Sequence, residues 1–410
     1  MAKLYEYQSK KLLAKEGIKV PKGRIANNPS DVEEIARELG GTTVLKAQTW
    51  TTGRMAQGGV LFATSPSEAS KISKSIFGKK IGGFETKKIL VEEKIPCIRE
   101  LFAAIILDDT IPSPVLIIKS QGGSGIEDMV LLENQQIMKF PFTVNRGIRE
   151  YEARDIGRKL GLEGKILMGF AAFIYNLYKV SRRYEARFVE INPIIISKDN
   201  QLYAADCRMA IDDYAVPRHP ELGIQFAREL SRPPNELEII AYKVEENDYR
   251  GTFYFFQMES EPKHPYYVAF HGRGGGGSIM AFDILKLCGL EPGNYSDTSG
   301  NPPASKTYKA ARIILSQPGL KGYFLSGGGA SSQEEYHTAR GLVKAFREVK
   351  IEIPAVIHIR GNAEEEAKDI LRRYTADLPG TVEAYGSEKD GEFCARRLKE
   401  LIDQQKRISG

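Results

Sequence analysis

The last 150 residues of this chain repeat one pattern, and that pattern restricts the possible folds more than any other feature. Short strand-like runs alternate five times with longer amphipathic runs. The strand-like runs are YYVAFH, NYSDTSG, KGYFLSGGG, IPAVIHIRG and TVEAYG. Repeated strand–helix units predict a doubly wound parallel sheet, an α/β fold. Ligands of such sheets bind at the carboxyl ends of the strands, where helix N-termini present N–H groups.

Residues 1 to about 215 follow a different pattern. LFAAIIL and PVLIIKS lie on either side of Asp108 and Asp109 and predict an antiparallel hairpin, and ARFVEINPIII and QLYAADCR predict another. This half is therefore predicted to be α+β, with mostly antiparallel sheet. A segment with clustered prolines follows. We predict domains at 1–225 and 261–410, with a connecting segment at 226–260.

Several classes of protein are disfavoured by composition. No run approaches the roughly 18 apolar residues of a membrane-spanning helix. The net charge of +5 is mild and does not argue for a nucleic-acid partner. The four cysteines are scattered without a C-x-x-C pair, and the charged N-terminal stretch does not resemble a secretory signal. We therefore expect a cytoplasmic protein without a membrane segment.

Three strand ends of the second half are rich in glycine: 271–278, 325–332 and 359–362. Glycine lets backbone N–H groups approach an anion closely. The first of these ends contains G-x-G-x-x-G, and Asp297 follows about twenty residues later, as in a dinucleotide-binding fingerprint. Three interpretations stay open here: a carboxylate or phosphate site, a tight turn needed for packing, and a nicotinamide dinucleotide site.

The first half carries a different set of candidates. Lys46 lies inside the apolar run VLKAQ, and the Gly-bearing loop 49–59 with Arg54 follows it. Such a loop could close over phosphates, and an inward lysine could neutralise their oxygens. The alternative is a strand lysine whose ammonium group reaches solvent.

Polar side chains in apolar strands form a third set. Glu190 and Asn192 lie two apart in VEINP, on one face of a strand, and Asp206 lies across the predicted hairpin. Mg²⁺ prefers oxygen ligands of this kind together with phosphate oxygens. Surface charges are the alternative, but the apolar surroundings favour partnered groups.

Other catalytic patterns are missing from the sequence. No G-x-x-x-x-G-K-[ST] motif occurs, which excludes a P-loop. The five histidines show no metal-ligand spacing and no nucleophile-elbow context, so a triad hydrolase has no support.

Together these segments resemble a known family. The opening YEYQSKKLLAKEGI, and then ILVEEKIPCIRELFAAIILDD, SQGGSGIED and FVEINPIIISKDNQLYAADCRMA, are similar to the β-type subunit of succinyl-CoA synthetase. These proteins are ATP-grasp acyl-CoA ligases. The resemblance extends over essentially the whole chain and implies an ATP-grasp domain followed by a flavodoxin-like domain.

The resemblance also implies roles for individual residues. The nucleotide would be held by Lys46, Gly53, Arg54, Glu92, Ile95 and Glu100. Asn192 and Asp206 would bind Mg²⁺, and Glu190 would face the phosphoryl group in transit. In this family a histidine on an α-type partner subunit receives the phosphate, and that partner also brings the CoA-binding domain. Transfer through a covalent intermediate divides one difficult step into easier ones.

The sequence departs from the succinate enzymes at several turns. The lid segment around Trp50 and Met55 differs from the family's His-Ala-Gly-Gly-Arg-Gly, and GGGAS and TSGNPP are similar to citrate-activating relatives. Two arginines at the other glycine-rich strand ends, Arg273 and Arg360, favour a tricarboxylate, because bidentate arginine–carboxylate pairs recognise such anions. The predicted acid-binding residues are Arg273, Gly274, Gly275, Gly327, Gly328, Gly329 and Arg360.

The substrate expected first is therefore citrate, with succinate, malate or another dicarboxylate as alternatives. The chain would belong to a citryl-CoA synthetase or to a split ATP-citrate lyase, and the retained succinyl-CoA-synthetase pattern favours the synthetase. A non-catalytic scaffold subunit is the alternative from another class. The joint presence of Lys46, Glu190, Asn192 and Asp206 argues against it.

Overall fold

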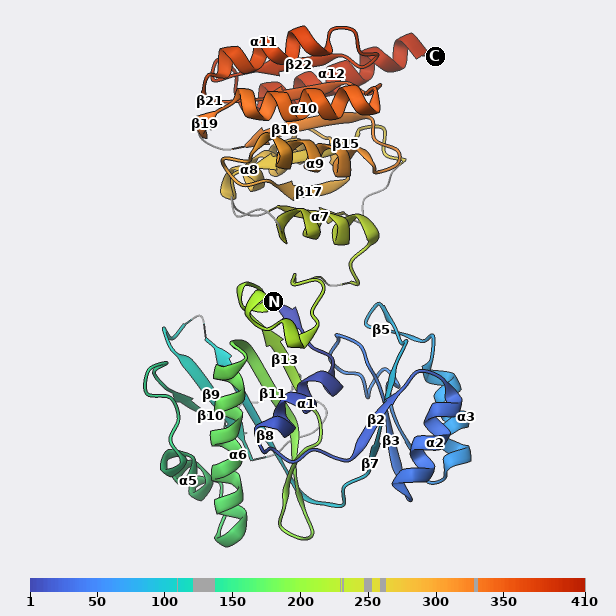
Figure 1. Ribbon diagram of the computed structural model, residues 1–410, viewed down its shortest axis with the longest axis vertical. Coiled ribbons are helices and arrows are strands. Elements are labelled where there is room, and N and C mark those ends of the chain that lie inside the picture. Colours follow the sequence, from blue (N-terminus) through green and yellow to red (C-terminus); the bar gives the residue numbers. More distant parts are fainter. Residues whose placement is uncertain are drawn as a thin grey trace. The chain divides into compact units, whose positions relative to one another are not determined.

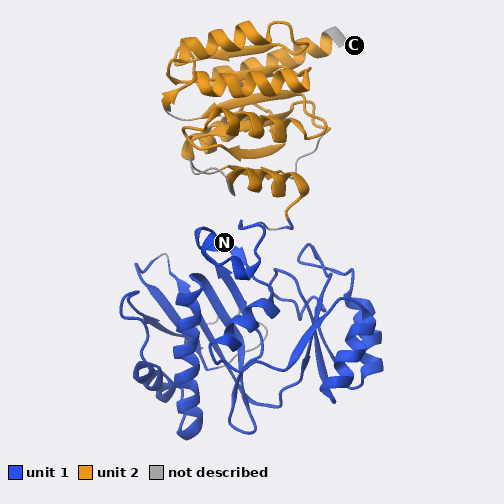
Figure 2. Cartoon of the chain, viewed as in Figure 1, with its two compact units in different colours: residues 1–233 blue, residues 234–410 orange. Residues whose placement is uncertain are grey.

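The computed structural model divides the chain into two compact units, residues 1–233 and 234–410 (Figure 2). The structure describes residues 1–108, 110–120, 137–228, 230, 232–246, 253–258, 263–327 and 331–409. Each unit has its own sheets and helices (Figure 1).

Unit 1 contains a smaller sheet with the strand order β2-β7-β3-β4. Its strands are β2 (Gly23–Ala26), β3 (Thr43–Ala47), β4 (Val60–Ala63) and β7 (Ile89–Glu93), and every pairing among them is antiparallel. Helices α2 (Pro29–Leu39) and α3 (Pro66–Ile76) pack on this sheet. Both helices begin at a capped turn, because the side chains of Asn28 and Ser65 accept backbone N–H groups of the first turn.

The larger sheet of unit 1 has the order β1-β13-β11-β8-β9-β10, and β12 pairs with β11. Its strands are β1 (Ala2–Lys3), β8 (Cys97–Leu107), β9 (Pro114–Lys119), β10 (Ile137–Pro141), β11 (Ala186–Ser197), β12 (Leu202–Ala204) and β13 (Arg208–Ile211). The remaining elements of unit 1 are α1 (Glu6–Lys15), β5 (Lys80–Ile81), β6 (Phe84–Glu85), α5 (Glu150–Lys159), α6 (Gly164–Arg183) and the short 3₁₀ helices η1 (Asp213–Arg218) and η2 (Pro220–Leu222). Both predicted hairpins, β8–β9 and β11–β12, are confirmed as antiparallel pairs.

Unit 2 is the predicted doubly wound sheet. Its strands are β14 (Tyr254–Gln257), β15 (Tyr267–Arg273), β16 (Glu291–Pro292), β17 (Asn294–Asp297), β18 (Gly322–Gly327), β20 (Ala355–His358) and β22 (Val382–Tyr385), with β19 (Ser331–Glu334) and β21 (Gly361–Asn362) forming a separate pair. Its helices are α7 (Glu236–Glu246), α8 (Gly276–Leu287), α9 (Ala304–Leu315), α10 (Tyr336–Val349), α11 (Glu364–Thr375) and α12 (Gly391–Ser409).

The strand order of unit 2 identifies its topology. Strands lie in the order β14-β17-β15-β18-β20-β22. If β15 is numbered one, the parallel strands read 2-1-3-4-5, which is the flavodoxin-like order. The antiparallel β14 extends the sheet beyond β17. The flavodoxin-like prediction is therefore confirmed.

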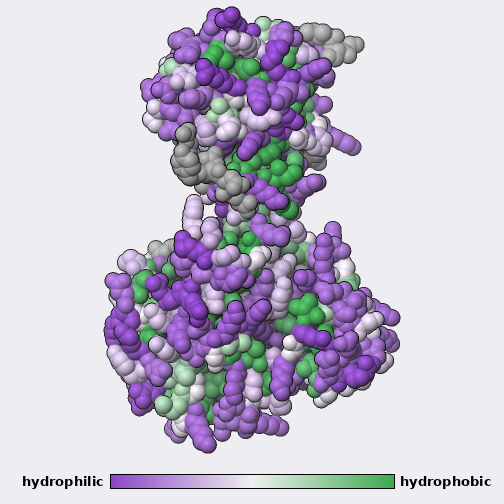
Figure 3. Space-filling view, viewed as in Figure 1, coloured by the Kyte–Doolittle hydropathy of each residue, from purple (hydrophilic) through white to green (hydrophobic). Residues whose placement is uncertain are grey.

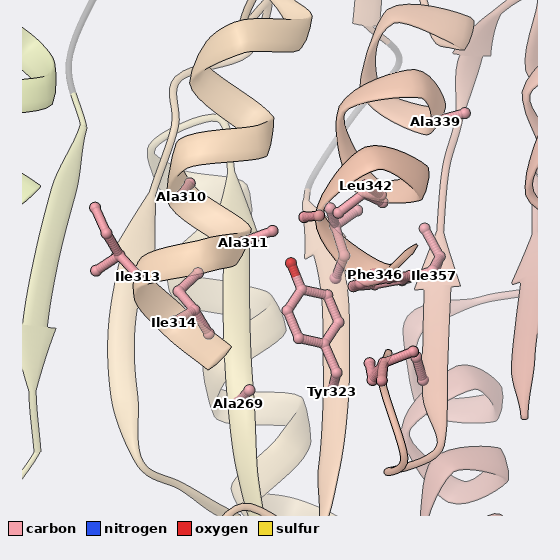
Figure 4. Packing of buried hydrophobic residues seen from close by; sticks show 14 of the residues in the cluster. Ala269, Ala310, Ala311, Ile313, Ile314, Tyr323, Ala339, Leu342, Phe346 and Ile357 are labelled. Atoms are coloured by element: carbon pink, nitrogen blue, oxygen red, sulfur yellow. The ribbon is translucent and has the colours of Figure 1, made fainter. Parts of the chain in front are cut away.

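Large side chains from the sheet and from one layer of helices form the core of unit 2. Figure 4 shows Tyr323 of β18 between Ile314 of α9 and Phe346 of α10. The rings of Tyr323 and Phe346 meet edge to face, with centroids 5.1 Å apart. Ile314 belongs to the repeat β17–α9, and Tyr323 and Phe346 belong to the next repeat, β18–α10, so the core requires that neighbouring repeats fold together.

The predicted connection at 226–260 contains regular structure. Helix α7 and strand β14 lie within it, and β14 pairs with β17 of the parallel sheet. The prolines that suggested a linker end at Pro234, where unit 2 begins. Figure 3 shows mostly hydrophilic residues on the faces of both units in this view. Among the described residues, no helix combines the length and the apolar character needed to cross a membrane.

Candidate functional site

A cavity of about 410 Å³ lies in unit 1 between its two sheets. Its wall takes residues from β3, β4 and β7 of the smaller sheet and from β8, β11 and β13 of the larger one. The predicted nucleotide and metal residues all line it: Lys46, Gly53, Arg54, Glu92, Ile95, Glu100, Glu190, Asn192 and Asp206. The volume lies within the range of small-molecule sites.

Strand geometry explains why Lys46 and Glu92 meet. Strands β3 and β7 are antiparallel neighbours in which Val44 lies opposite Glu92 and Lys46 opposite Leu90. Lys46 and Glu92 are therefore diagonal neighbours on one face, because side chains alternate along a strand. The ammonium nitrogen of Lys46 lies 2.9 Å from a carboxylate oxygen of Glu92.

These residues belong to a buried cluster that also includes two residues of α1. We name this the charge cluster; its described members are Glu6, Lys10, Lys46, Arg54, Glu92 and Asp206. Three formal positive charges face three negative ones among these members, so the cluster is neutral as a whole. Charges buried in this way need partners, because removing an ion from water is costly.

The neighbours in the cluster keep Lys46 and Glu6 ionised. Burial by itself would lower the pKa of Lys46, but Glu6 and Glu92 outweigh it and raise that pKa above its ordinary value. Burial by itself would raise the pKa of Glu6, but Lys10, Lys46 and Arg54 hold that pKa well below its ordinary range. The cavity therefore has fixed cationic groups in its wall at neutral pH, as binding of a polyphosphate requires.

The loop between β3 and β4 brings Arg54 into this cluster. Gly53 has a φ of +61°, in the left-handed region that glycine adopts without strain. From there Arg54 turns inward, where its Nη1 donates to the carbonyl of Ala47 at 2.9 Å and its Nη2 donates to Asp206 at 2.7 Å. Trp50 stacks on Tyr5 with ring centroids 5.0 Å apart, so the loop is packed at its first residues.

The opposite wall carries the predicted metal ligands. Glu190 and Asn192 come from β11, and Asp206 follows β12. Carboxylate and amide oxygens are the donor types that Mg²⁺ takes, and the Asp206 carboxylate already lies beside a cation, the guanidinium of Arg54. The side chains present therefore fit a magnesium site.

The rest of the wall is partly apolar. It includes Val44, Val60 and Phe62 from the smaller sheet and Ile95 and Ile195 from the other side. An apolar slot beside fixed charges suits a ligand with a flat aromatic part and an anionic part.

Sequence reasoning missed several residues of the site. Glu6 and Lys10 stand four apart in α1 and are both buried. Helical spacing could have found them, because they share the buried face with Ser9 and Leu13. Arg208 also lines the cavity and lies opposite Glu190 in the register of β11 and β13. No pattern in the sequence singled it out.

The predicted acid-binding residues of unit 2 gather at the carboxyl ends of parallel strands. Arg273 and Gly327 are register partners at the ends of β15 and β18. Arg360, which follows β20, donates from Nη2 to the carbonyl oxygen of Gly327 at 3.1 Å. A Cβ at position 327 would lie 2.2 Å from the carbonyl oxygen of Arg273, so close strand packing alone requires this glycine. Gly328 and Gly329 lie outside the described residues.

Arg273 differs from the expectation that it offers its charge to a substrate. Its Nη1 and Nη2 donate to the two carboxylate oxygens of Glu335, at 2.8 and 2.7 Å. Glu335 is fully buried and precedes α10. This bidentate pair neutralises the arginine within the chain. The sequence contains no signal that links positions 62 residues apart.

The backbone donors of the first glycine-rich turn also have a partner. The N–H groups of Gly274 and Gly275 donate to the carboxylate of Asp297 at 3.1 and 2.7 Å. The aspartate that completes the dinucleotide-like pattern in the sequence therefore stabilises the turn itself.

Comparison with known proteins agrees with this geometry. A family model for the ATP-grasp domain matches residues 3–196. The chain is 33% identical over 370 residues to the β subunit of the ADP-forming succinate–CoA ligase of Methanothermobacter thermautotrophicus, covering 90% of this chain and 93% of that protein. It is 33% identical over 383 residues to the β subunit of the GDP-forming ligase of Thermus thermophilus, covering 93% and 96%.

A solved structure shares the fold over nearly the whole length. ATP citrate lyase from Methanothrix soehngenii, in complex with citrate and coenzyme A, has a TM-score of 0.78 and 21% identity, covering 97% of this chain and 99% of that one. ATP-grasp ligases of this family use ATP and Mg²⁺, for which the cavity of unit 1 has suitable side chains. With an ATP-grasp unit, a flavodoxin-like unit and relatives matched across both, the chain belongs to the succinyl-CoA synthetase β-subunit family of ATP-grasp acyl-CoA ligases.

Proposed function

We propose that this chain is the nucleotide-binding subunit of an acid–CoA ligase and that MgATP binds in the cavity of unit 1. One observation carries the proposal: buried, permanently charged Lys46 and Arg54 line the same cavity as Asn192 and Asp206. The first two would contact phosphate oxygens, and the last two would hold Mg²⁺. The apolar part of the wall would take the base.

Phosphoryl transfer is dominated by positioning and by neutralisation of charge. Mg²⁺ held by Asn192 and Asp206 would supply part of that neutralisation when bound. Lys46 and Arg54 act from positions fixed by the charge cluster, so little reorganisation is needed during the reaction. Glu190 would face the phosphoryl group, and a histidine of an α-type partner subunit would accept it. The phosphohistidine would then transfer its phosphoryl group to the acid, which becomes an acyl phosphate and frees the histidine. The thiol of CoA held by the partner would attack the acyl carbon and release phosphate.

The acid we propose first is citrate, bound at the strand ends of unit 2. The GGGAS and TSGNPP turns and Arg360 support this choice. Among the residues that the structure describes, Arg360 donates one hydrogen bond, to a neutral carbonyl, so its charge could be offered to a carboxylate without breaking an ion pair within that part of the chain. Gly274, Gly275, Gly327, Gly328 and Gly329 complete the proposed site, and Arg273, the register partner of Gly327, stands beside it with its charge paired to Glu335. A citryl-CoA synthetase is proposed ahead of a split ATP-citrate lyase.

Succinate is the second candidate, and two observations favour it. The relatives at 33% identity are succinate–CoA ligases. Arg273, which was expected to add a cationic donor for a third carboxylate, is already paired with Glu335. A ligase for a dicarboxylate needs fewer cationic donors.

The function is tested with the chain and its partner subunit together. Asp206→Ala is expected to abolish phosphorylation of the partner histidine while the chain stays folded. Asp199→Ala, at an exposed turn of the β11–β12 hairpin, is the matched control. Equal phosphorylation by the Asp206 variant would contradict the metal assignment. A panel of citrate, succinate and malate, measured as ADP release with CoA, identifies the acid.

A further inference from the structure

Glu6 lies behind the cavity rather than in its wall, and it contacts every cation of the charge cluster. One of its carboxylate oxygens lies 2.8 Å from Lys10 and 2.9 Å from Lys46, and the other lies 2.8 Å from Arg54. Its side chain is only 1% exposed. Glu92 contacts Lys10 and Lys46, and Asp206 contacts Arg54. Within the described part of the cluster, Glu6 alone joins Lys46 to Arg54.

The contacts of Lys46 explain why this matters for binding. Its ammonium group has three N–H donors, and the structure gives it three acceptors: Glu6, Glu92 and the carbonyl of Ala205. A phosphate oxygen that takes one donor leaves two contacts that still hold the group in place. Without Glu6, Glu92 and the carbonyl of Ala205 would still hold the ammonium group, but the carboxylate that links it to Arg54 would be lost.

The contacts of Arg54 concern the metal ligand. Its Nη2 is shared between Glu6 and Asp206, at 2.8 and 2.7 Å. When Asp206 turns to a metal ion, Glu6 keeps the guanidinium in place. When Glu6 is neutralised, Asp206 becomes the carboxylate that compensates Arg54, so the arginine competes with the metal for it.

We propose that Glu6 is a positioning residue of the nucleotide site: a single buried carboxylate of α1 that fixes Lys46 and Arg54 together and leaves Asp206 available to Mg²⁺. The inference rests on the proposed function of the cavity. It assigns to the first helix a role in binding that the helix performs without touching the ligand.

The test measures binding of MgATP to the full-length chain by calorimetry over a series of Mg²⁺ concentrations. In Glu6→Gln we expect the Kd for MgATP to rise about tenfold or more, as for loss of one charge-assisted contact. We also expect the Mg²⁺ concentration for half-maximal binding to rise, which a merely structural role would not cause. Glu16→Gln is the matched control, because Glu16 follows the same helix and pairs with Arg183 outside the cluster. Its binding should be unchanged.

A second variant tests whether the position of the Glu6 carboxylate matters for binding, independently of the net charge of the charge cluster and of the stability of the fold. Glu6→Gln combined with Lys10→Gln removes one charge of each sign and leaves two against two. We expect this double variant to regain most of the thermal stability lost by Glu6→Gln, but not the affinity for MgATP. Recovery of affinity, or unchanged affinity and Mg²⁺ requirement in folded Glu6→Gln, would overturn the inference. A wild-type chain that binds no nucleotide would instead overturn the proposed function, and the inference with it.

Discussion

Both units bury charged side chains, but they arrange them differently. In unit 1 the members of the charge cluster share partners beside a cavity, and Lys46 contacts two carboxylates. In unit 2 Arg273 and Glu335 form a bidentate pair with each other. A shared network can lose one contact to a ligand and keep the rest. In the Arg273–Glu335 pair, which we call the closed pair, each charge is already compensated by the other. We therefore expect this pair to affect mainly the stability of the fold.

The largest effect should follow from breaking the closed pair of unit 2. Glu335→Gln leaves Arg273 buried without its counter-charge, which costs about 3–5 kcal/mol of folding free energy. Chemical denaturation followed by circular dichroism measures the loss. The chain's one tryptophan, Trp50, lies in unit 1, so its fluorescence should show an unchanged transition. Glu348→Gln, which removes an exposed pair with Arg312, should change the folding free energy much less, because solvent screens an exposed pair. Equal effects of both variants would contradict the contrast between a buried and an exposed pair.

The next effect concerns binding in unit 1. Lys46→Met removes a buried cation from the cavity wall and is expected to weaken MgATP binding about 100-fold. Calorimetry with the full chain measures it. Lys71→Met, on the exposed side of α3, is the control and should bind as the wild type does. Wild-type affinity in the Lys46 variant would mean that the cavity is not the nucleotide site.

A smaller effect, on the binding of the acid and not of ATP, is expected from a substitution at the strand ends of unit 2. Arg360→Ala is expected to raise the apparent Michaelis constant for the acid about tenfold and to leave that for ATP unchanged, because one arginine–carboxylate contact is lost. Steady-state kinetics with the partner subunit measure both constants. Arg372→Ala, on the exposed face of α11, is the control. A change in the ATP constant alone would place the acid elsewhere.

The last prediction is a pH dependence of stability in unit 2, whose effect within any one pH unit is small. Burial, with a contribution from Arg273, lowers the pKa of His271 to about 3. An unfolded chain takes up that proton near the ordinary pKa of 6.5, so stability is fully present above pH 6.5 and declines as the pH falls toward 3. The slope for this one group is at most about 1.4 kcal/mol per pH unit. Denaturation at several pH values should show a flatter dependence in His271→Asn. An identical slope in the variant would contradict the assignment.

The fold was largely predictable because its signals are local. The strand–helix repeats, with runs such as KGYFLSGGG, predicted the sheet of unit 2, and the apolar runs around Asp108 predicted the β8–β9 hairpin. The segment 226–260 was less predictable. The strand β14 within it is short, and its pairing with β17 depends on a partner distant in the sequence.

The candidate site was predictable where motifs mark it. Asp206 stands in a segment that resembles the family, Lys46 lies inside an apolar run and Arg54 follows it in a Gly-bearing loop, and all three line one cavity. Glu6 stands in a resembling segment too, but its role depends on contacts 40 and 48 positions away. Glu335 could not be linked to Arg273 for the same reason.

The sequence alone was sufficient to determine two architectures, a family and the residue types of a magnesium–nucleotide site, because periodicity and motifs are properties of neighbouring residues. Tertiary structure decided which charges share partners. The Glu6 carboxylate supports two cations from separate segments, and Glu335 neutralises Arg273, which the sequence pattern assigns to the acid. Electrostatic energy depends on distance in space, and folding brings together charges that are far apart along the chain.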